Sequence, residues 1–353
     1  MSVSPFDHAL LSGLLGDDEV SPFFSADSEI QHMLRFEEAL ALAEAQEGVV
    51  PSKMADGIVE QIQSFVPNYD AIRRATQRDG VIGVEFVRQL RDALGAPLDQ
   101  YVHFGATSQD LVDSALVLRL RPVLHILEQR IVAIRDKFAD LNQRFGERRV
   151  MGRTRMQDAL PIAVREKLAT WDGPLERHLA RLAELRPRLM VLQFGGAAGT
   201  LDKLGDRAEQ VCGRLAEALD LAPARSWHSQ RDTIVELAGW LSQVAGSLGK
   251  AGADIGLMAQ NRFGEVALEG GGGSSAMPHK HNPVGAEVLV ALAHFNATQI
   301  SGMHSALVHE QERSGAAWTL EWLILPQMVV ATAASLRTAL TLLSQINRIG
   351  DPT

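Results

Sequence analysis

The amino-acid sequence predicts an all-α protein built around a bundle of long helices. Two observations lead to this prediction. Apolar residues recur at helical spacing over long stretches, for example over residues 107–145. In addition, no run of alternating β-branched residues is found, and the 353 residues include only 2 Tyr, a residue type that strands favour. Patterns of this length favour a bundle over a compact cluster of short helices.

The first hundred residues predict a small domain of shorter helices. One helix is expected from about Ser28 to Gly48, where the glycine is a typical stop signal. Further short helices are expected over residues 52–64 and 68–95. We therefore expect an N-terminal helical domain over residues 1–105.

The remaining residues, 106–353, predict the central bundle. Thr107 caps the first long helix, and its apolar stripe comprises Leu111, Ala115, Leu118, Leu124, Leu127, Ile131 and Ile134. Three further long patterns follow, at residues 161–194, 233–263 and 284–343. The Gly173-Pro174 pair is expected to kink or interrupt the second helix.

Composition limits the classes of partner and the compartment. The net charge of −9 argues against nucleic acid or an anionic membrane as partner, because no basic excess is available to neutralise phosphates. The single cysteine, Cys212, fits a cytoplasmic location. The N-terminus has no signal-peptide pattern, and we expect no membrane span. We also expect no metal site and no cofactor, since the histidines are scattered and no nucleotide-binding glycine motif follows a strand.

One loop carries the strongest chemical signal. Residues 269–283 read Glu-Gly-Gly-Gly-Gly-Ser-Ser-Ala-Met-Pro-His-Lys-His-Asn-Pro. A flexible linker is the simplest alternative, but a linker does not need the second half of this segment. The glycines permit a mobile loop that closes over a substrate. A serine hydroxyl beside the Lys280 cation suits proton exchange at a carbon next to a carboxylate, and the Asn282 amide can bind that carboxylate.

This loop resembles the signature of the fumarase/aspartase superfamily, which includes adenylosuccinate lyase, argininosuccinate lyase and fumarase. The resemblance implies an all-helical homotetramer with a twenty-helix core and active sites shared between subunits. It also implies that Ser274 is the catalytic acid/base, that Ser275 helps to position it, and that Lys280 and Asn282 bind a substrate carboxylate. Met277 belongs to the same motif and is grouped with the substrate-binding residues. Members usually have a third, C-terminal helical domain, which we expect to be largely absent here.

Two further segments are similar to the other signature regions of the superfamily. Residues 103–110, His-Phe-Gly-Ala-Thr-Ser-Gln-Asp, resemble the first region. There the resemblance implies substrate binding by His103, Thr107 and Ser108, and a helix start is physically suited to anions. The alternative is a simple helix cap. Residues 152–161 resemble the second region and place Arg155 and Gln157 among the substrate-binding residues.

Arg155 departs from the pattern of the lyases. They have a histidine at this position as the general acid/base, oriented by a glutamate that corresponds to Glu287. Arginine stays charged near neutral pH and cannot shuttle a proton. Either another histidine, such as His103 or His279, takes this role, or the reaction does not need it. A lactone-forming enzyme does not need it, because the ionised carboxylate of the substrate is itself the nucleophile.

Residues 193–201 and 227–232 are similar to segments of the 3-carboxy-cis,cis-muconate cycloisomerase branch. This resemblance implies a cycloisomerase that converts 3-carboxy-cis,cis-muconate, or a close analogue, to a muconolactone in protocatechuate catabolism. Arg231 then either binds the small tricarboxylate substrate or forms an ion pair within the bundle. The alternatives are an adenylosuccinate-lyase-like C–N lyase and a non-catalytic structural homologue.

The length of the first long helix predicts that one chain is not sufficient. At 1.5 Å per residue, residues 108–145 span roughly 55 Å. Thr107 and Ser108 lie at one end of this helix, whereas Arg155 and Gln157 follow its other end. We therefore expect a homotetramer in which neighbouring subunits bring opposite ends together.

Overall fold

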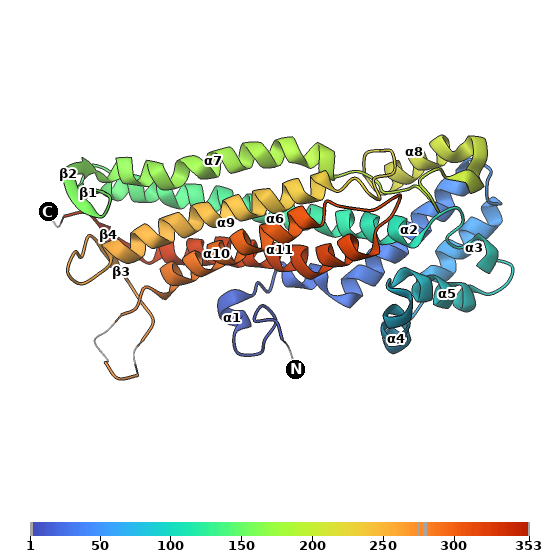
Figure 1. The fold of residues 1–353 in the computed structure, drawn as a ribbon, viewed down its shortest axis with the longest axis horizontal. Coiled ribbons are helices and arrows are strands. Elements are labelled where there is room, and N and C mark those ends of the chain that lie inside the picture. The colour runs from blue at the N-terminus through green and yellow to red at the C-terminus, as the bar shows by residue number, and fades with distance from the viewer. Residues whose placement is uncertain (1–2, 274, 278–280, 352–353) are drawn as a thin grey trace.

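The protein is described by a computed structural model that covers residues 3–273, 275–277 and 281–351. Five long helices lie side by side along its longest axis (Figure 1). They are α6 (Ser108–Phe145), α7 (Val164–Leu189), α9 (Asp232–Met258), α10 (Val284–Ser305) and α11 (Gly315–Ser344). The predicted all-α fold class is confirmed.

Shorter helices lie beside the long ones, and all of them except α1 gather around the start of α6 (Figure 1). They are α1 (Ser12–Leu15), α2 (Ala26–Gln46), α3 (Ser52–Ile62), α4 (Tyr69–Asp79), α5 (Gly83–Leu94) and α8 (Ala208–Ala218), with 3-10 turns at Ser21–Phe24, Asp99–Tyr101 and Asp202–Arg207. Helix α2 begins where Ser25 Oγ accepts a hydrogen bond from Ser28 N at 3.2 Å, a typical N-cap. It packs against α3, α6 and α8. The division at residues 105 and 106 remains a prediction.

The core follows the predicted apolar stripe of α6. All seven residues of that stripe are buried, and residues such as Leu111, Leu127 and Ile131 have no exposed surface. Burying one such side chain stabilises the fold by about 1.5–3 kcal/mol. The same core reaches α2, where the Phe36 ring meets Phe194 edge-on with centroids 6.5 Å apart. A single apolar stripe thus joins the long helices to the N-terminal ones.

Three expected helix boundaries were wrong. The pattern at 284–343 is two antiparallel helices, because polar residues 310–313 and the Ser314 cap, which accepts from Ala317 N at 3.2 Å, interrupt it. The pattern at 233–263 ends as a helix at Met258. Conversely, α7 begins only at Val164 and then runs through the Gly173-Pro174 pair without a break.

Two small two-stranded antiparallel sheets were not predicted, and only the first of them is a hairpin. Strands β1 (Arg149–Thr154) and β2 (Gln157–Ala163) pair with each other, and β3 (Val266–Leu268) pairs with β4 (Ile346–Ile349). Both lie at the end of the bundle opposite the shorter helices, close to the glycine-rich loop (Figure 1). A backbone hydrogen bond from Gly350 N to Glu265 O at 2.8 Å extends the β3–β4 pairing, and one from Asp351 N to Arg149 O at 3.0 Å connects this sheet to β1.

Helix α11 is long and apolar enough to span a membrane by length and composition alone, with a mean hydropathy of 1.4 over its most apolar window. However, 72% of that window is buried inside the molecule. The helix packs against α6, α9 and α10. Its apolar character is therefore that of a core helix, in agreement with the expectation of no membrane span.

Candidate functional site

The predicted site residues lie in two groups at opposite ends of α6. His103, Thr107 and Ser108 precede or begin this helix of 38 residues, which is about 57 Å long. Arg155 and Gln157 follow its other end. We call the first the Thr107 end. The second, with residues 149–163 and the described residues of the glycine-rich loop (270–273, 275–277 and 281–283), we call the hairpin end.

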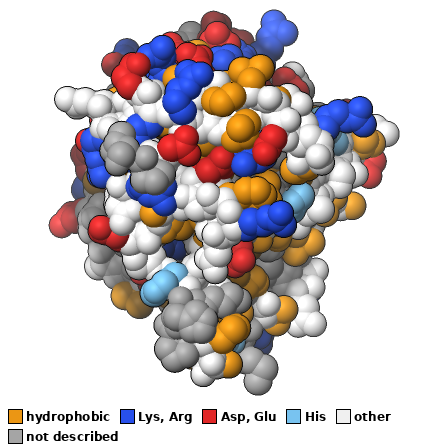
Figure 2. All heavy atoms as spheres, turned by 90° about the vertical axis from the view of Figure 1, so that its left-hand side faces the viewer, with side chains coloured by type: hydrophobic (Ala, Val, Ile, Leu, Met, Phe, Trp, Pro, Cys, Tyr) orange, Lys and Arg blue, Asp and Glu red, His pale blue; other side chains and the backbone are white. Residues whose placement is uncertain are grey.

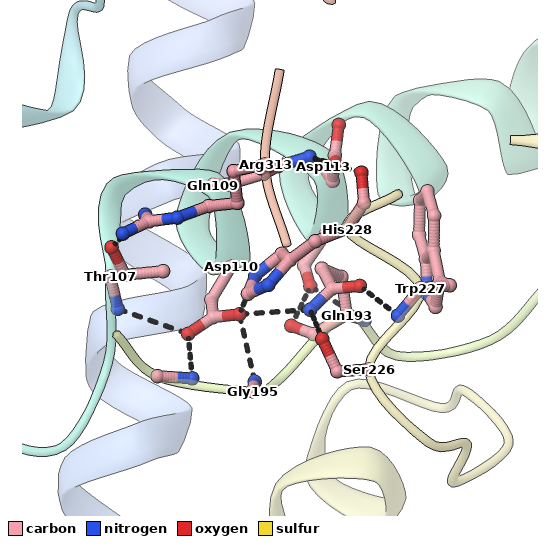
Figure 3. Close-up of polar contacts among 12 residues, drawn as sticks. Thr107, Gln109, Asp110, Asp113, Gln193, Gly195, Ser226, Trp227, His228 and Arg313 are labelled. Atoms are coloured by element: carbon pink, nitrogen blue, oxygen red, sulfur yellow. Dashed lines mark hydrogen bonds and ion pairs between the residues drawn. The ribbon is translucent and has the colours of Figure 1, made fainter. Parts of the chain in front are cut away.

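A buried carboxylate organises the Thr107 end. Asp110, in the first turn of α6, has no exposed side-chain surface and lies at the centre of the contacts in Figure 3. It accepts hydrogen bonds from five donors: Thr107 N at 3.0 Å, Gly195 N and Gly196 N at 2.8 Å, Gln193 Nε2 at 2.9 Å and His228 Nε2 at 2.8 Å. A buried carboxylate is stable only with such partners. Asp110 therefore holds two distant segments, residues 193–196 and His228, against the helix start.

Gln193 extends this network. Its Oε1 accepts from Trp227 N at 2.7 Å, and its Nε2 also donates to Ser226 Oγ at 3.2 Å. The segments joined in this way form a cleft of about 830 Å³. The cleft wall includes Thr200, Ser226, His228, Ser229, Gln230 and Glu312. The wall also includes apolar residues such as Phe194 and Leu201, and a concave wall that combines apolar residues with a few polar groups is typical of a binding site for a small molecule.

His103 and Ser108 are held tightly at the same end. His103 Nδ1 lies 2.6 Å from the buried Glu37 Oε1 of α2, and the His103 backbone has a positive φ of 58°. Ser108 packs against the first turn of α5, where a Cβ on Gly83 would come within 2.9 Å of its side chain. Both side chains are largely shielded by their own chain.

Arg313 also belongs to the Thr107 end, although the sequence did not single it out. It lies between α10 and α11 and donates to Thr107 Oγ1 at 2.6 Å and to Ala197 O at 2.7 Å. Its side chain is otherwise exposed, so it places a cation over the start of α6. The polar stretch at residues 310–313 was the available signal, but the assumed continuous helix concealed it.

The hairpin end has a strained turn. Arg155 and Met156 connect β1 to β2 with φ values of 49° and 65°. A two-residue turn with both φ values positive favours glycine or asparagine, so two bulky residues here are unusual. Arg155, Met156 and Gln157 are all exposed. Between Arg155 and Glu287, which are both described, the structure has no ion pair.

The glycine-rich loop is closed at its base. Gly272 and Asn282 exchange two backbone hydrogen bonds of 2.9 Å, and a Cβ on Gly272 would lie 2.4 Å from the Val284 side chain, so only glycine fits. Ser275 and Met277 are exposed, and Asn282 is half-buried. Ser274, His279 and Lys280 lie outside the described residues. Glu287 is exposed in the first turn of α10.

The surface of the hairpin end is mixed. Figure 2 looks onto this end and shows basic, acidic and apolar side chains interspersed. Met156 and Leu160 of the hairpin are 77% and 62% exposed. Single exposed apolar side chains among charged ones, as here, are common on protein surfaces.

Arg231 lies in the core, away from solvent. Its guanidinium contacts Asp113 Oδ2 and Glu321 Oε2, each at 2.6 Å, and all three side chains are at most 2% exposed. Burial alone would lower the pKa of Arg231, but the two carboxylates raise it. Of the two roles considered from the sequence, this arrangement is the ion pair within the bundle.

Known proteins resemble this chain over most of its length. A profile of the lyase family matches residues 17–302. The 3-carboxy-cis,cis-muconate cycloisomerase of Pseudomonas aeruginosa is 44% identical over 327 residues, which are 91% of this chain and 71% of that protein. The enzyme of the same name from Acinetobacter baylyi is 37% identical over 95% of this chain and 76% of its own length.

A solved structure agrees with these relatives. The crystal structure of the 3-carboxy-cis,cis-muconate lactonizing enzyme from Pseudomonas putida superposes with a TM-score of 0.91 at 39% identity. The match covers 97% of this chain and 77% of that one. The predicted resemblance is confirmed: this chain belongs to the lyase family of the fumarase/aspartase superfamily, whose members include the 3-carboxy-cis,cis-muconate cycloisomerases.

Proposed function

We propose that this chain catalyses the cycloisomerisation of 3-carboxy-cis,cis-muconate, or a close substituted analogue, to a muconolactone. The observation that carries the proposal is the similarity, at 37–44% identity and over at least 90% of this chain, to several enzymes of that name. Arg155 adds support, since the lyases of the superfamily have a proton-shuttling histidine at this position. A lactonising enzyme works without that group.

The proposed reaction has one bond-forming step and one proton transfer. A carboxylate oxygen of the substrate attacks one alkene carbon, and the π electrons move to the neighbouring carbon, which takes a proton. Ser274 is the proposed donor of this proton, with Ser275 positioning it. Lys280 and Asn282 are proposed to hold a substrate carboxylate, and Glu287 is proposed to support the loop from the first turn of α10.

The cations of the two ends fit a substrate with three carboxylates. Arg313, over Thr107 and Ser108, is one anion-binding candidate, and Arg155 in the exposed turn is another. Because these residues are separated by the length of α6, they can serve one substrate only if different subunits contribute them. We therefore propose a homotetramer with shared active sites, in the cytoplasm. A fully active monomer in analytical ultracentrifugation would contradict this assembly.

Loss of the conjugated diene absorbance provides the test. Purified protein is incubated with a panel of substituted muconates, and we expect turnover of the 3-carboxy compound. Ser274→Ala should lower kcat by about 100-fold or more, because general acid catalysis typically contributes 10²–10⁴. Ser301→Ala, on the exposed face of α10, is the matched control. Release of fumarate from adenylosuccinate, with no turnover of muconates, would instead support the C–N lyase alternative.

A further inference from the structure

A histidine outside the superfamily signature segments lines the cleft of the Thr107 end. The His228 ring forms part of the cleft wall, although its side chain is only 3% exposed. Behind it, Nε2 lies 2.8 Å from Oδ1 of the fully buried Asp110 (Figure 3). A histidine oriented by a buried carboxylate at the wall of a cleft is the arrangement that proton-transfer sites use.

The contacts of Asp110 determine which ring nitrogen can react. Its other four neighbours are all N–H donors, from Thr107, Gly195, Gly196 and Gln193. The carboxylate thus acts only as an acceptor, and His228 Nε2 must carry a hydrogen and donate it. Nδ1 is the nitrogen left to gain or release a proton. Among the described residues, Nδ1 has no hydrogen-bond partner.

The backbone keeps the ring in place. Gln109 Nε2 donates to His228 O at 2.9 Å, and the neighbouring Trp227 N donates to Gln193 Oε1 at 2.7 Å. Other charged groups that face the cleft are Glu209 of α8, Arg225, and Glu312 of the segment between α10 and α11. The cleft also includes Ala198, next to the Ala197 carbonyl that binds Arg313. His228 and the anion-binding candidates Thr107 and Arg313 therefore border the same region.

We infer that His228 holds, on Nδ1, the proton that each turnover of this enzyme takes up. This inference rests on the proposed function. Ring closure converts one carboxylate of the trianion into an ester and adds one proton to carbon, so one proton is consumed per turnover. The His228 imidazolium gives its Nδ1 proton to the group that protonated the carbon, which a neighbouring subunit brings to this cleft in the proposed tetramer. A proton from water then restores the imidazolium, and Asp110 keeps the ring oriented throughout.

His228→Gln separates proton transfer from a structural role. The glutamine amide can still donate to Asp110, but it cannot transfer a proton near neutral pH. We expect kcat to fall by about 100-fold or more, with KM and Tm close to the wild-type values, and the pH dependence of kcat to lose one limb. His178→Gln is the matched control, since His178 is also 3% exposed and bonds Ser247 Oγ at 2.9 Å, but lies on α7 outside the cleft. Wild-type kcat and pH dependence in His228→Gln would overturn the inference.

A measurement without substrate distinguishes this inference from the proposed function. In protein labelled with ¹⁵N-histidine, the signal missing from His228→Gln identifies His228. We expect Nε2 to stay protonated while Nδ1 gains and loses its proton as the pH is changed. An Nδ1 that does not titrate would refute the proton-transfer role even in an active enzyme. Failure of the wild-type protein to convert any muconate would refute the proposed function, and the titration would still decide the state of His228.

Discussion

The two ends of the bundle differ in how their polar groups are satisfied. At the Thr107 end, Asp110 alone binds five donors, and Thr107, Gln193 and His228 are fixed by contacts within the same chain. At the hairpin end, Arg155, Gln157 and Glu287 project from the surface. One end is therefore completed by its own chain, whereas the side chains of the other remain available to something outside it.

This difference separates the site residues that stabilise the fold from those that remain available to contact a ligand or a partner. Buried polar groups need partners, and their loss is costly. Exposed groups on a turn contribute little to folding, so their presence needs another explanation. The two arginines that the sequence grouped as substrate-binding differ in this respect: Arg155 is exposed, whereas Arg231 is buried in an ion pair.

Replacing these two arginines should show the largest difference in stability between a buried and an exposed site residue. Arg231→Met should lower the free energy of unfolding by about 3–5 kcal/mol, because it leaves Asp113 and Glu321 buried without their cation. Arg155→Met, the matched control, should change it by no more than about 0.5 kcal/mol. Urea denaturation measures both. Equal effects of the two substitutions would show that Arg231 is not the centre of a buried ion cluster.

The role of Arg231 shows where sequence reasoning reaches its limit. Its partners Asp113 and Glu321 are 118 and 90 residues away along the chain. Asp110 was recognised only as part of a helix start for the same reason, since its donors Gln193 and His228 are 83 and 118 residues away. Such partners become neighbours only through the packing of the long helices, which local patterns do not specify.

The long helices themselves were largely predictable. The start of α6 and its buried stripe follow from local signals, a threonine cap and a period of 3.6 residues. The hairpin was missed, because β2 is mostly exposed and the Arg155-Met156 turn has no glycine or asparagine. The motif resemblance identified the glycine-rich loop, but Ser274 and Lys280, its proposed reactive groups, lie outside the described residues.

Glu44, in one of the short helices around the Thr107 end, departs from the rule that buried polar groups have hydrogen-bond partners. This residue of α2 is fully buried, and both its carboxylate oxygens have no hydrogen-bond partner in the described structure. Burial, together with the negative charge of Glu37, raises the pKa of Glu44 to about 9. The folded chain therefore keeps a proton that the unfolded chain loses above about pH 4.5, so the free energy of unfolding falls as pH rises from there to about 9.

Glu44→Gln should remove this pH dependence. We expect the variant to match the wild type near pH 4.5 and to exceed its free energy of unfolding by up to about 5 kcal/mol at pH 8, since one pKa unit corresponds to about 1.4 kcal/mol. Denaturation at both pH values provides the measurement. Glu38→Gln, a half-exposed position on the same helix, is the control. A constant difference between Glu44→Gln and the wild type at all pH values would contradict an unpaired, protonated Glu44.

The smallest effect is expected at the hairpin end, at Met156. The Met156 φ of 65° destabilises the folded state by about 1–2 kcal/mol for any residue with a Cβ atom. Glycine avoids this strain, but its greater conformational freedom stabilises the unfolded chain and offsets part of the gain. Met156→Gly should therefore raise the free energy of unfolding by about 1 kcal/mol or less. Met151→Gly, on strand β1 of the same hairpin, should lower it, because there glycine only removes packing and adds freedom to the unfolded chain.

Activity assays of Met156→Gly then show why the turn keeps a strained, exposed and bulky residue. If the hairpin completes an active site in a neighbouring subunit, the stabilised variant should lose turnover or tetramer stability, since strain persists where function requires it. A variant that is both more stable and fully active would show that this turn only connects two strands. The β1–β2 hairpin would then have no role in catalysis, and the proposed sharing of sites would have to involve the glycine-rich loop without the hairpin.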